Sequence, residues 1–509
     1  MSHPKSDTCD ITLLLEGTFP YVSGGVSSWV NQIIRAYPEY RFGLIFLGSR
    51  REDYSKFRYE LPENVVHFEE HFLYDGLNDN NRPKGHEGDP EAFKIVNDLH
   101  LSFKADNADV ALQSFRKIAS QMLPKGKLTA DDFLRSRMAW DLICQRYNES
   151  CNDPSFVDYF WTVRMMHAPL WKLASIVSTA PKSRVFHTIS TGYAGFLGAL
   201  LKNTLGTPLI LSEHGIYTKE RKIDLFKSEW IKDSRNLFQR DSSELSYFRQ
   251  MWIRFFEWLG RFCYDASDQI IALYEQNRLR QVADGASDER SFNIPNGINL
   301  PRFAPLRDQR PEDDPPLVLC LIGRVVPIKD IKTFIRAMRY VANRLPTAEG
   351  WIAGPEDEDP AYAEECKALV ISLGLQENIK FLGFQRVDAL MPKIGLTILS
   401  SISEALPLVI LEGYAAGVPT VSTEVGSCRQ LVEGLTDEDK AIGPSGAIVD
   451  IADPEALANA SLDLLTNKAR WKAASNAAIA RVERFYDDRI MFGSYKKVYE
   501  TALAQSSES

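Results

Sequence analysis

The chain has 509 residues, of which 44% are hydrophobic and 25% charged, with a formal net charge of −9. This length and composition are typical of a globular protein with two or three domains. The acidic balance argues against nucleic acid as a partner, since nucleic-acid-binding proteins usually carry a basic face. We find neither an apolar leader nor an apolar run of the ~18 residues that span a bilayer, so we expect a cytoplasmic protein.

Short apolar runs alternate with helical patterns from the start of the chain. Residues 11–15 predict a buried strand, and a loop with Gly24 and Gly25 precedes apolar residues at helical spacing. Residues 76–165 break this alternation and are predicted to form a helical insertion, with one helix across residues 131–148. Further strands are predicted at residues 42–47, 185–187, 209–212 and 269–273.

A second alternating unit follows the charged, proline-rich segment 307–316, which is typical of a linker. Its predicted strands are residues 317–322, 351–353, 380–382, 396–400 and 419–422. Such alternation predicts parallel sheets covered by helices on both faces. We therefore expect an α/β protein with two Rossmann-like, doubly wound domains, residues 1–300 and 301–485. A cleft between them would hold a ligand at the carboxyl ends of the strands.

Two carboxylates stand eight positions apart in the second unit. Glu404 falls on the loop after the strand at residues 396–400, and Glu412 falls inside the next helix, about two turns further on. Leu408 lies between them. This spacing allows one carboxylate to reach a sugar ring while the other reaches a ribose. Taken alone, such residues are more often solvated or helix-capping carboxylates.

Two cations follow the strand at residues 317–322. Arg324 and Lys329 lie on the loop at the carboxyl end of this strand, where an α/β domain binds its ligand. They would stabilise the charge that develops on a departing nucleotide diphosphate. Surface cations near a helix start are the alternative.

The first unit offers two weaker candidates. The Gly24-Gly25 loop precedes a helix whose first N–H groups would suit an anion, or it is only a tight turn. It is not a G-x-G-x-x-G loop, which disfavours a dehydrogenase. His214 follows the strand at residues 209–212 and would reach a sugar hydroxyl, or it is a buried structural histidine. Residues 219–221 form a polar cluster that is expected to be exposed, facing an acceptor or the phosphates.

Two D-x-D strings, at residues 357–359 and 437–439, are of the kind that holds a divalent ion in metal-dependent transferases of another fold. The first lies just before a predicted helix, where carboxylates are stabilising for structural reasons. We interpret both strings as structural and predict no metal site.

Together these motifs resemble those of the GT-B, family 4 glycosyltransferases. The resemblance rests on strings in the family's order: Gly24-Gly25, residues 294–298, Gly323-Arg324 with Lys329, residues 381–384, Glu404 to Glu412, and residues 416–422 with 425–426. The N-terminal half, through residues 213–221 and its long insertion, resembles the Pel exopolysaccharide synthase subfamily.

The resemblance implies a GT-B fold and a retaining glycosyltransferase that uses a nucleotide-sugar, with UDP-glucose or a UDP-N-acetylhexosamine expected. The acceptor would be a growing biofilm exopolysaccharide. Neither a cofactor nor a metal is expected, and inner-membrane synthase and export proteins are the expected partners. The alternatives are a transferase for another glycan or glycolipid, a non-catalytic nucleotide-sugar sensor, and an epimerase of the same fold.

The resemblance also implies roles for single residues. Glu404 and His214 would act at the donor sugar, as the catalytic residues. The donor-binding residues would be Arg324 and Lys329 on the diphosphate, Glu412 on the ribose, Gly24 and Gly25 through close backbone approach, Gly383 and Phe384 near the base, and Leu408. A C-terminal helix within residues 486–509 would return to the first domain.

Overall fold

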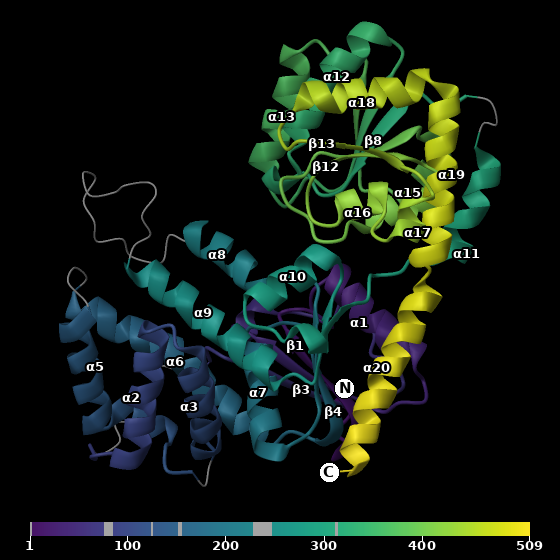
Figure 1. Cartoon of the computed structure of the whole chain (residues 1–509). Helices are drawn as coiled ribbons and strands as arrows, with labels where there is room; N and C mark the ends of the chain where they lie inside the picture. Colours follow the sequence, from purple (N-terminus) through teal and green to yellow (C-terminus); the bar gives the residue numbers. More distant parts are fainter. Residues whose placement is uncertain are drawn as a thin grey trace. The chain divides into compact units, whose positions relative to one another are not determined.

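Short runs of aliphatic residues form the strands of two parallel sheets. The computed structural model describes residues 3–75, 85–123, 126–150, 155–227, 247–310 and 314–508. The chain divides into two units with one sheet each (Figure 1). Unit 1 comprises Met1–Ala272, Asn277–Asn293 and Lys496–Ser509, and unit 2 comprises Leu273–Gln276 and Ile294–Tyr495. Two Rossmann-like sheets confirm the predicted α/β fold class.

The sheet of unit 1 has seven strands in the order β3-β2-β1-β4-β5-β6-β7. Its strands are β1 (Thr8–Glu16), β2 (Phe42–Gly48), β3 (Val65–Phe72), β4 (Lys182–Thr188), β5 (Leu209–Glu213), β6 (Gln269–Ala272) and β7 (Ser291–Asn293). The strand order reverses between β1 and β4, which makes this the topological switch point of the sheet. Sequence analysis missed the two edge strands, because β3 contains four histidine and glutamate residues and β7 has three residues.

Helices fill the interruption that the sequence predicted. They are α2 (Pro90–Lys104), α3 (Ala108–Gln121), α4 (Ala130–Arg135), α5 (Arg137–Ser150) and α6 (Phe156–Val177). Residues 76–84, 124–125 and 151–154 of the predicted insertion lie outside the described residues. The single helix predicted across residues 131–148 is wrong, because Ser136 is extended and its Oγ accepts a hydrogen bond from the Ala139 N–H (3.1 Å), which starts α5.

The other helices of unit 1 are α1 (Gly25–Ala36), α7 (Tyr193–Leu205), α8 (Tyr217–Lys227), α9 (Tyr247–Ala266), α10 (Glu275–Ala283) and the second part of α20 (Asp488–Glu508). Tyr499 of α20 is fully buried within unit 1. Its hydroxyl lies 2.9 Å from Nδ1 of His187 on β4, and its ring meets the Tyr37 ring edge-on. The C-terminal helix therefore contributes core residues to the N-terminal unit.

The sheet of unit 2 has six strands in the order β10-β9-β8-β11-β12-β13. Its strands are β8 (Val318–Ile322), β9 (Glu349–Ala353), β10 (Ile379–Gly383), β11 (Leu396–Leu399), β12 (Thr420–Thr423) and β13 (Gly446–Val449). Its helices are α11 (Leu300–Phe303), α12 (Ile331–Arg344), α13 (Pro360–Ser372), α14 (Val387–Leu390), α15 (Leu408–Ala415), α16 (Cys428–Glu433), α17 (Asp437–Lys440), α18 (Pro454–Thr466) and α19 (Lys468–Phe485). The switch point lies between β8 and β11.

Single 3₁₀ turns connect several of these elements, namely η1 (Arg51–Asp53), η2 (Asp288–Arg290), η3 (Ala304–Gln309), η4 (Pro327–Lys329) and η5 (Met391–Lys393). Residues 307–310 and 314–316 of the segment predicted as the linker belong to unit 2, and residues 311–313 lie outside the described residues; the N-terminal part of unit 1 ends at Asn293. Arg307 donates to the carbonyl oxygen of Ala415, and Arg310 donates to that of Met391. These hydrogen bonds explain why a charged, proline-rich sequence is part of a folded unit. Among the described residues, no helix combines the length and hydrophobicity that crossing a membrane requires.

Candidate active site

A lysine and a glutamate meet at the switch point of unit 2. Lys329 ends η4, which follows β8, and Glu404 lies on the loop after β11. Because β8 and β11 are paired in parallel, their carboxyl ends lie side by side. The Lys329 Nζ is 2.6 Å from the Glu404 Oε1, and both side chains are largely buried. The structure thus brings together two residues that the sequence places 75 positions apart.

Hydrogen bonds hold these two loops together. The Ser400 Oγ donates to the carbonyl oxygen of Lys329 (2.9 Å), and the Ile402 N–H donates to that of Ile328 (2.9 Å). The Ser401 Oγ donates to Glu404 Oε1 (2.7 Å). Sequence analysis did not select Ser400 or Ser401, although two serines directly after an apolar strand are a usable signal for a polar strand end.

The loop after β12 fixes the backbone of Glu404. The Ser427 N–H donates to the Ala405 carbonyl oxygen (2.9 Å). Gly426 has a φ of +53°, and a Cβ at this position would lie 2.3 Å from the Glu404 carbonyl oxygen. Only glycine combines this left-handed backbone with such a close approach. The position of Glu404 therefore depends on Gly426.

Arg324 lies on the same loop as Lys329, but it has a different partner. Its Nη1 is 2.5 and 2.6 Å from the two carboxylate oxygens of Glu358, which follows β9. About half of each side chain is exposed. Such an exposed ion pair is weak, so a phosphate would readily replace the carboxylate. Glu358 lies inside the first D-x-D string but was not predicted as a partner of Arg324.

Glu412 is a half-buried carboxyl group on α15, one turn after Leu408, the partly buried first residue of that helix. Burial raises the pKa of Glu412 to about 7, while the Arg302 guanidinium opposes this rise and the Asp388 carboxylate adds to it. A carboxyl group whose pKa is raised by burial in this way is typical of a ligand-binding residue.

Gly383 and Phe384 follow β10. Gly383 has a φ of +62°, and the Phe384 side chain is 80% exposed. An aromatic ring with this much exposure is available for stacking on a planar ligand. No contact joins it to the Lys329–Glu404 pair among those described.

Gly24 and Gly25 form the start of α1 in unit 1. Both are exposed, no side chain caps the helix, and a Cβ at either position would meet no atom within 4 Å. The open space above this backbone suits the close approach of a ligand to the first N–H groups of the helix.

His214 is buried against α1. Its ring meets that of Trp29 edge-on at 4.6 Å, so the structure brings His214 and the helix of Gly25 together. Burial lowers the pKa of His214 to about 4, which keeps the ring neutral near pH 7. Its Nε2 is buried without a hydrogen-bond partner among the described residues. An imidazole in this state suits a hydroxyl group of a ligand.

Glu213, next to His214, is fixed by four donors. Its buried carboxylate accepts hydrogen bonds from Thr191 Oγ1, Tyr264 OH, Gln281 Nε2 and the Tyr217 N–H, at 2.8 to 3.0 Å. This network holds the loop that carries His214. It identifies Glu213 as a structural residue.

In the polar cluster at residues 219–221, Lys219 and Glu220 are exposed as predicted, whereas Arg221 is only partly exposed. The Arg221 Nε donates to the Tyr217 hydroxyl (2.9 Å), and its guanidinium lies over the Tyr217 ring. The Tyr217 hydroxyl in turn donates to Glu16 at the end of β1 (2.8 Å). Packing against Tyr217, which the sequence pattern did not reveal, accounts for this difference.

One carboxylate of each D-x-D string has a structural partner. Asp359 accepts a hydrogen bond from the Tyr362 N–H (3.0 Å) and caps α13. Asp439 forms a buried ion pair with Arg481 (2.6 Å). These contacts agree with the structural interpretation of both carboxylates.

Two family models match the chain. The model described as a domain of unknown function (DUF3492) matches residues 9–289, more than half of the chain. The chain belongs to this family. The model for glycosyl transferases group 1 matches residues 303–481, which contain the Lys329–Glu404 pair. This second match lies within unit 2 of this DUF3492 protein.

Curated relatives match part of the chain. The D-inositol 3-phosphate glycosyltransferase of Acidothermus cellulolyticus is 30% identical over 243 residues, which cover 44% of this chain and 52% of that protein. The UDP-Gal:alpha-D-GlcNAc-diphosphoundecaprenol alpha-1,3-galactosyltransferase of Escherichia coli is 22% identical over 301 residues. These cover 56% of this chain and 67% of that protein. The chain spans about half the length of the first of these relatives.

Solved structures share the fold. Anabaena Alr3699/HepE in complex with UDP superimposes with a TM-score of 0.57 at 14% identity, over 97% of this chain and 100% of that chain. Sucrose-phosphate synthase (tll1590) from Thermosynechococcus elongatus gives a TM-score of 0.57 at 16% identity. The superposition covers 97% of this chain and 100% of that chain. At these identities the likeness establishes the GT-B fold.

Proposed function

We propose that this protein is a retaining glycosyltransferase that uses a UDP-sugar. The observation that carries the proposal is the Lys329–Glu404 pair at the switch point of a glycosyl transferases group 1 domain. A cation and a hydrogen-bonding carboxylate at this place suit a diphosphate and a sugar. UDP-glucose or a UDP-N-acetylhexosamine is the proposed donor, and the UDP complex of HepE supports the choice of base.

In the proposed reaction, the diphosphate of the donor replaces Glu404 as the ion-pair partner of Lys329. It also replaces Glu358 as the ion-pair partner of Arg324. The freed Glu404 carboxylate then accepts hydrogen bonds from the sugar hydroxyls. Glu412 accepts from the ribose hydroxyls. Both cations act most strongly when the bond from the sugar C1 to phosphate breaks, because negative charge then collects on the leaving group.

The acceptor hydroxyl attacks C1 on the face that the phosphate leaves, and the departing phosphate oxygen takes its proton. Configuration is retained without a protein nucleophile, unlike retaining glycosidases, which use two close carboxyl groups. Glu404 therefore positions the sugar. His214, neutral and with a free Nε2 among the described residues, is proposed to hydrogen-bond a sugar hydroxyl.

The proposed acceptor is a growing exopolysaccharide of the Pel type, and inner-membrane synthase and export proteins are the proposed partners. The string at residues 213–221 and the helices between β3 and β4 support this, since the N-terminal half resembles that of the Pel glycosyltransferase PelF. Metal-independent catalysis is part of the proposal, because Asp359 and Asp439 already have structural partners.

The test is nucleotide diphosphate release from a panel of UDP-, GDP- and ADP-sugars, with and without EDTA. Release from one UDP-sugar that survives EDTA supports the proposal. Loss of release with EDTA contradicts metal independence. If a UDP-sugar binds but no UDP is released with any acceptor present, the alternative of a nucleotide-sugar sensor is favoured.

Two variants test the site within this assay. Lys329→Ala and Glu404→Gln are each expected to lower turnover by about 10²–10³-fold, the usual cost of removing one transition-state contact, while the circular dichroism spectrum stays unchanged. Lys332→Ala removes a nearby lysine that pairs with Glu365 instead and serves as the control. Wild-type rates in both site variants would refute the assignment.

A further inference from the structure

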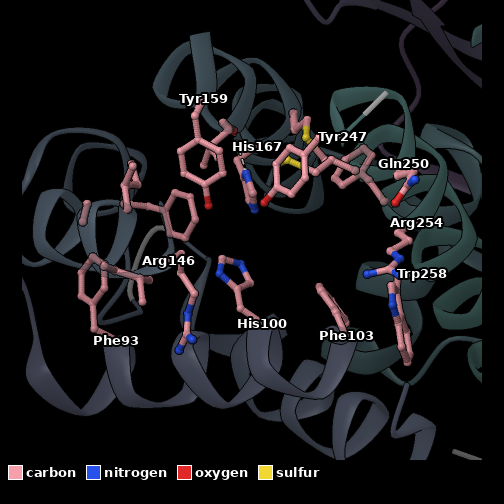
Figure 2. A pocket seen from close by; sticks show the side chains of 18 residues that line it. Phe93, His100, Phe103, Arg146, Tyr159, His167, Tyr247, Gln250, Arg254 and Trp258 are labelled. Atoms are coloured by element: carbon pink, nitrogen blue, oxygen red, sulfur yellow. Dashed lines mark hydrogen bonds between the residues drawn. The ribbon is translucent and has the colours of Figure 1, made fainter. Parts of the chain in front are cut away.

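The helical part of unit 1 contains a cavity of about 290 Å³ (Figure 2). Its walls come from α2, α4, α5, α6 and α9, and they are mostly aromatic and aliphatic side chains. This volume is close to the lower end of the roughly 300–1,000 Å³ that small-molecule sites usually have. None of the residues assigned to glycosyl transfer lines it.

A second, smaller cavity of about 70 Å³ shares walls with the first. The shared residues are His100, Phe103, Phe133, His167, Phe255 and Trp258. Apart from the two histidines, aliphatic side chains and aromatic rings line this inner cavity. The two hollows are thus neighbours, and the smaller one has the more apolar lining, which suits a hydrocarbon chain.

Two histidines point into the main cavity from opposite walls (Figure 2), with ring centroids 5.4 Å apart. The Nδ1 of His167 donates to the Val163 carbonyl oxygen (2.7 Å), so its Nε2 is an acceptor. Burial lowers the pKa of His100 to about 3 and also lowers that of His167. Both rings are therefore neutral near pH 7.

Among the described residues that line the cavity, Arg146 and Arg254 carry charges, and none is an aspartate or glutamate. Arg146 already pairs with Glu149 (2.6 Å). Arg254 is exposed, forms no ion pair among the described residues, and extends toward the hollow beside Trp258 (Figure 2). The nearby Glu257 pairs with Lys222 instead (2.6 Å).

We propose that this cavity is a binding site for an amphipathic anion, whose hydrocarbon body fills the apolar hollow and whose acidic group pairs with Arg254. The pairing would be a charge-assisted hydrogen bond, for which the guanidinium fork is well suited. Either a fatty carboxylate or an isoprenoid phosphate has this chemistry. The inference does not depend on the proposed sugar transfer.

The test is isothermal titration of the full chain with decanoate and with geranyl monophosphate, which have ten-carbon bodies and represent the two sources. Geraniol is the neutral counterpart. We expect one site per chain and at least about tenfold tighter binding of one anion than of geraniol. The anion that binds more tightly identifies the source. Absence of binding by both anions would overturn the proposal.

Variants separate this site from nonspecific uptake. Arg254→Ala should weaken anion binding about tenfold and leave geraniol binding unchanged. Arg137→Ala removes a charge from an exposed arginine outside the lining. It should change neither anion binding nor geraniol binding. Ala139→Phe, which fills the cavity, should abolish binding of all three; if it fails to fold, Arg254→Ala decides. Equal anion binding by Arg254→Ala and the wild type would refute the proposal.

Discussion

At the scale of single residues, Glu412 lowers stability at a place where we propose that a ligand binds. A half-buried carboxyl group with a pKa near 7 destabilises the fold when it is ionised. A residue that lowers stability in this way is expected where a ligand needs it. The ribose hydroxyls of a donor would supply the hydrogen bonds that its carboxylate lacks among the described residues.

Glu412→Gln is expected to stabilise the protein at high pH. The pKa of Glu412 is about 7 in the folded state and has the ordinary value of 4.5 in the unfolded state. Between these pH values the folded state therefore binds more protons than the unfolded state, so stability falls as pH rises from 4.5 to 7. Glutamine carries no charge, so the variant should be more stable by roughly 1–3 kcal/mol at pH 8 and about equal at pH 4. Urea denaturation at both pH values measures this. A less stable variant at pH 8 would contradict the burial argument.

Glu358→Gln is expected to tighten UDP binding. The exposed pair with Arg324 competes with phosphate and is worth about 0.2–1 kcal/mol, which corresponds to a gain of up to about fivefold. Glu365→Gln, which removes the same charge from the pair with Lys332, is the control. Weaker UDP binding by Glu358→Gln would show that Glu358 itself supports the nucleotide.

At the scale of elements, three strand ends build the site of unit 2. The loops after β8 and β11 are joined by Ser400 and Ile402, and the loop after β12 approaches the Glu404 backbone at Gly426. The site is therefore preorganised by loops of one rigid sheet, which is what transition-state stabilisation requires.

Gly426→Ala tests this preorganisation. The added Cβ would collide with the carbonyl oxygens of Glu404 and Ala405 at 2.3 and 2.4 Å. We expect a loss of stability of roughly 1–3 kcal/mol together with a fall in turnover. Gly374→Ala has a comparable φ of +63° and open space around it, so it should cost stability only. Equal turnover in both variants would show that the Glu404 loop tolerates displacement.

At the scale of the whole chain, the C-terminal helix completes the core of the N-terminal unit. Tyr499 is fully buried there. Tyr499→Ala should cost about 3–5 kcal/mol, as large-to-small changes of buried aromatic residues do. Lys496→Ala breaks only an exposed ion pair with Glu39 and should cost less than about 1 kcal/mol. Chemical denaturation of both variants measures the difference, and similar costs would contradict this role.

Much of this architecture was predictable because β1, β2, β5, β8 and β11 are apolar runs in regular alternation with helices. The edge strands β3 and β7 were not, since polar residues and short length hide them. The sequence also located Glu404 and Lys329 at strand ends, but it did not predict their ion pair. Partners such as Glu358 and Ser401, and the cavity between five helices, depend on tertiary packing that has no local pattern.

The most direct measurement of the central claim is calorimetric titration of UDP into the wild type, Lys329→Ala and Lys332→Ala. The account predicts that UDP binds the wild type and Lys332→Ala equally. It predicts at least about tenfold weaker binding to Lys329→Ala, because a charge-assisted contact to the diphosphate is lost. Equal affinity of all three proteins for UDP, or no binding by the wild type, would contradict a donor site at the Lys329–Glu404 pair.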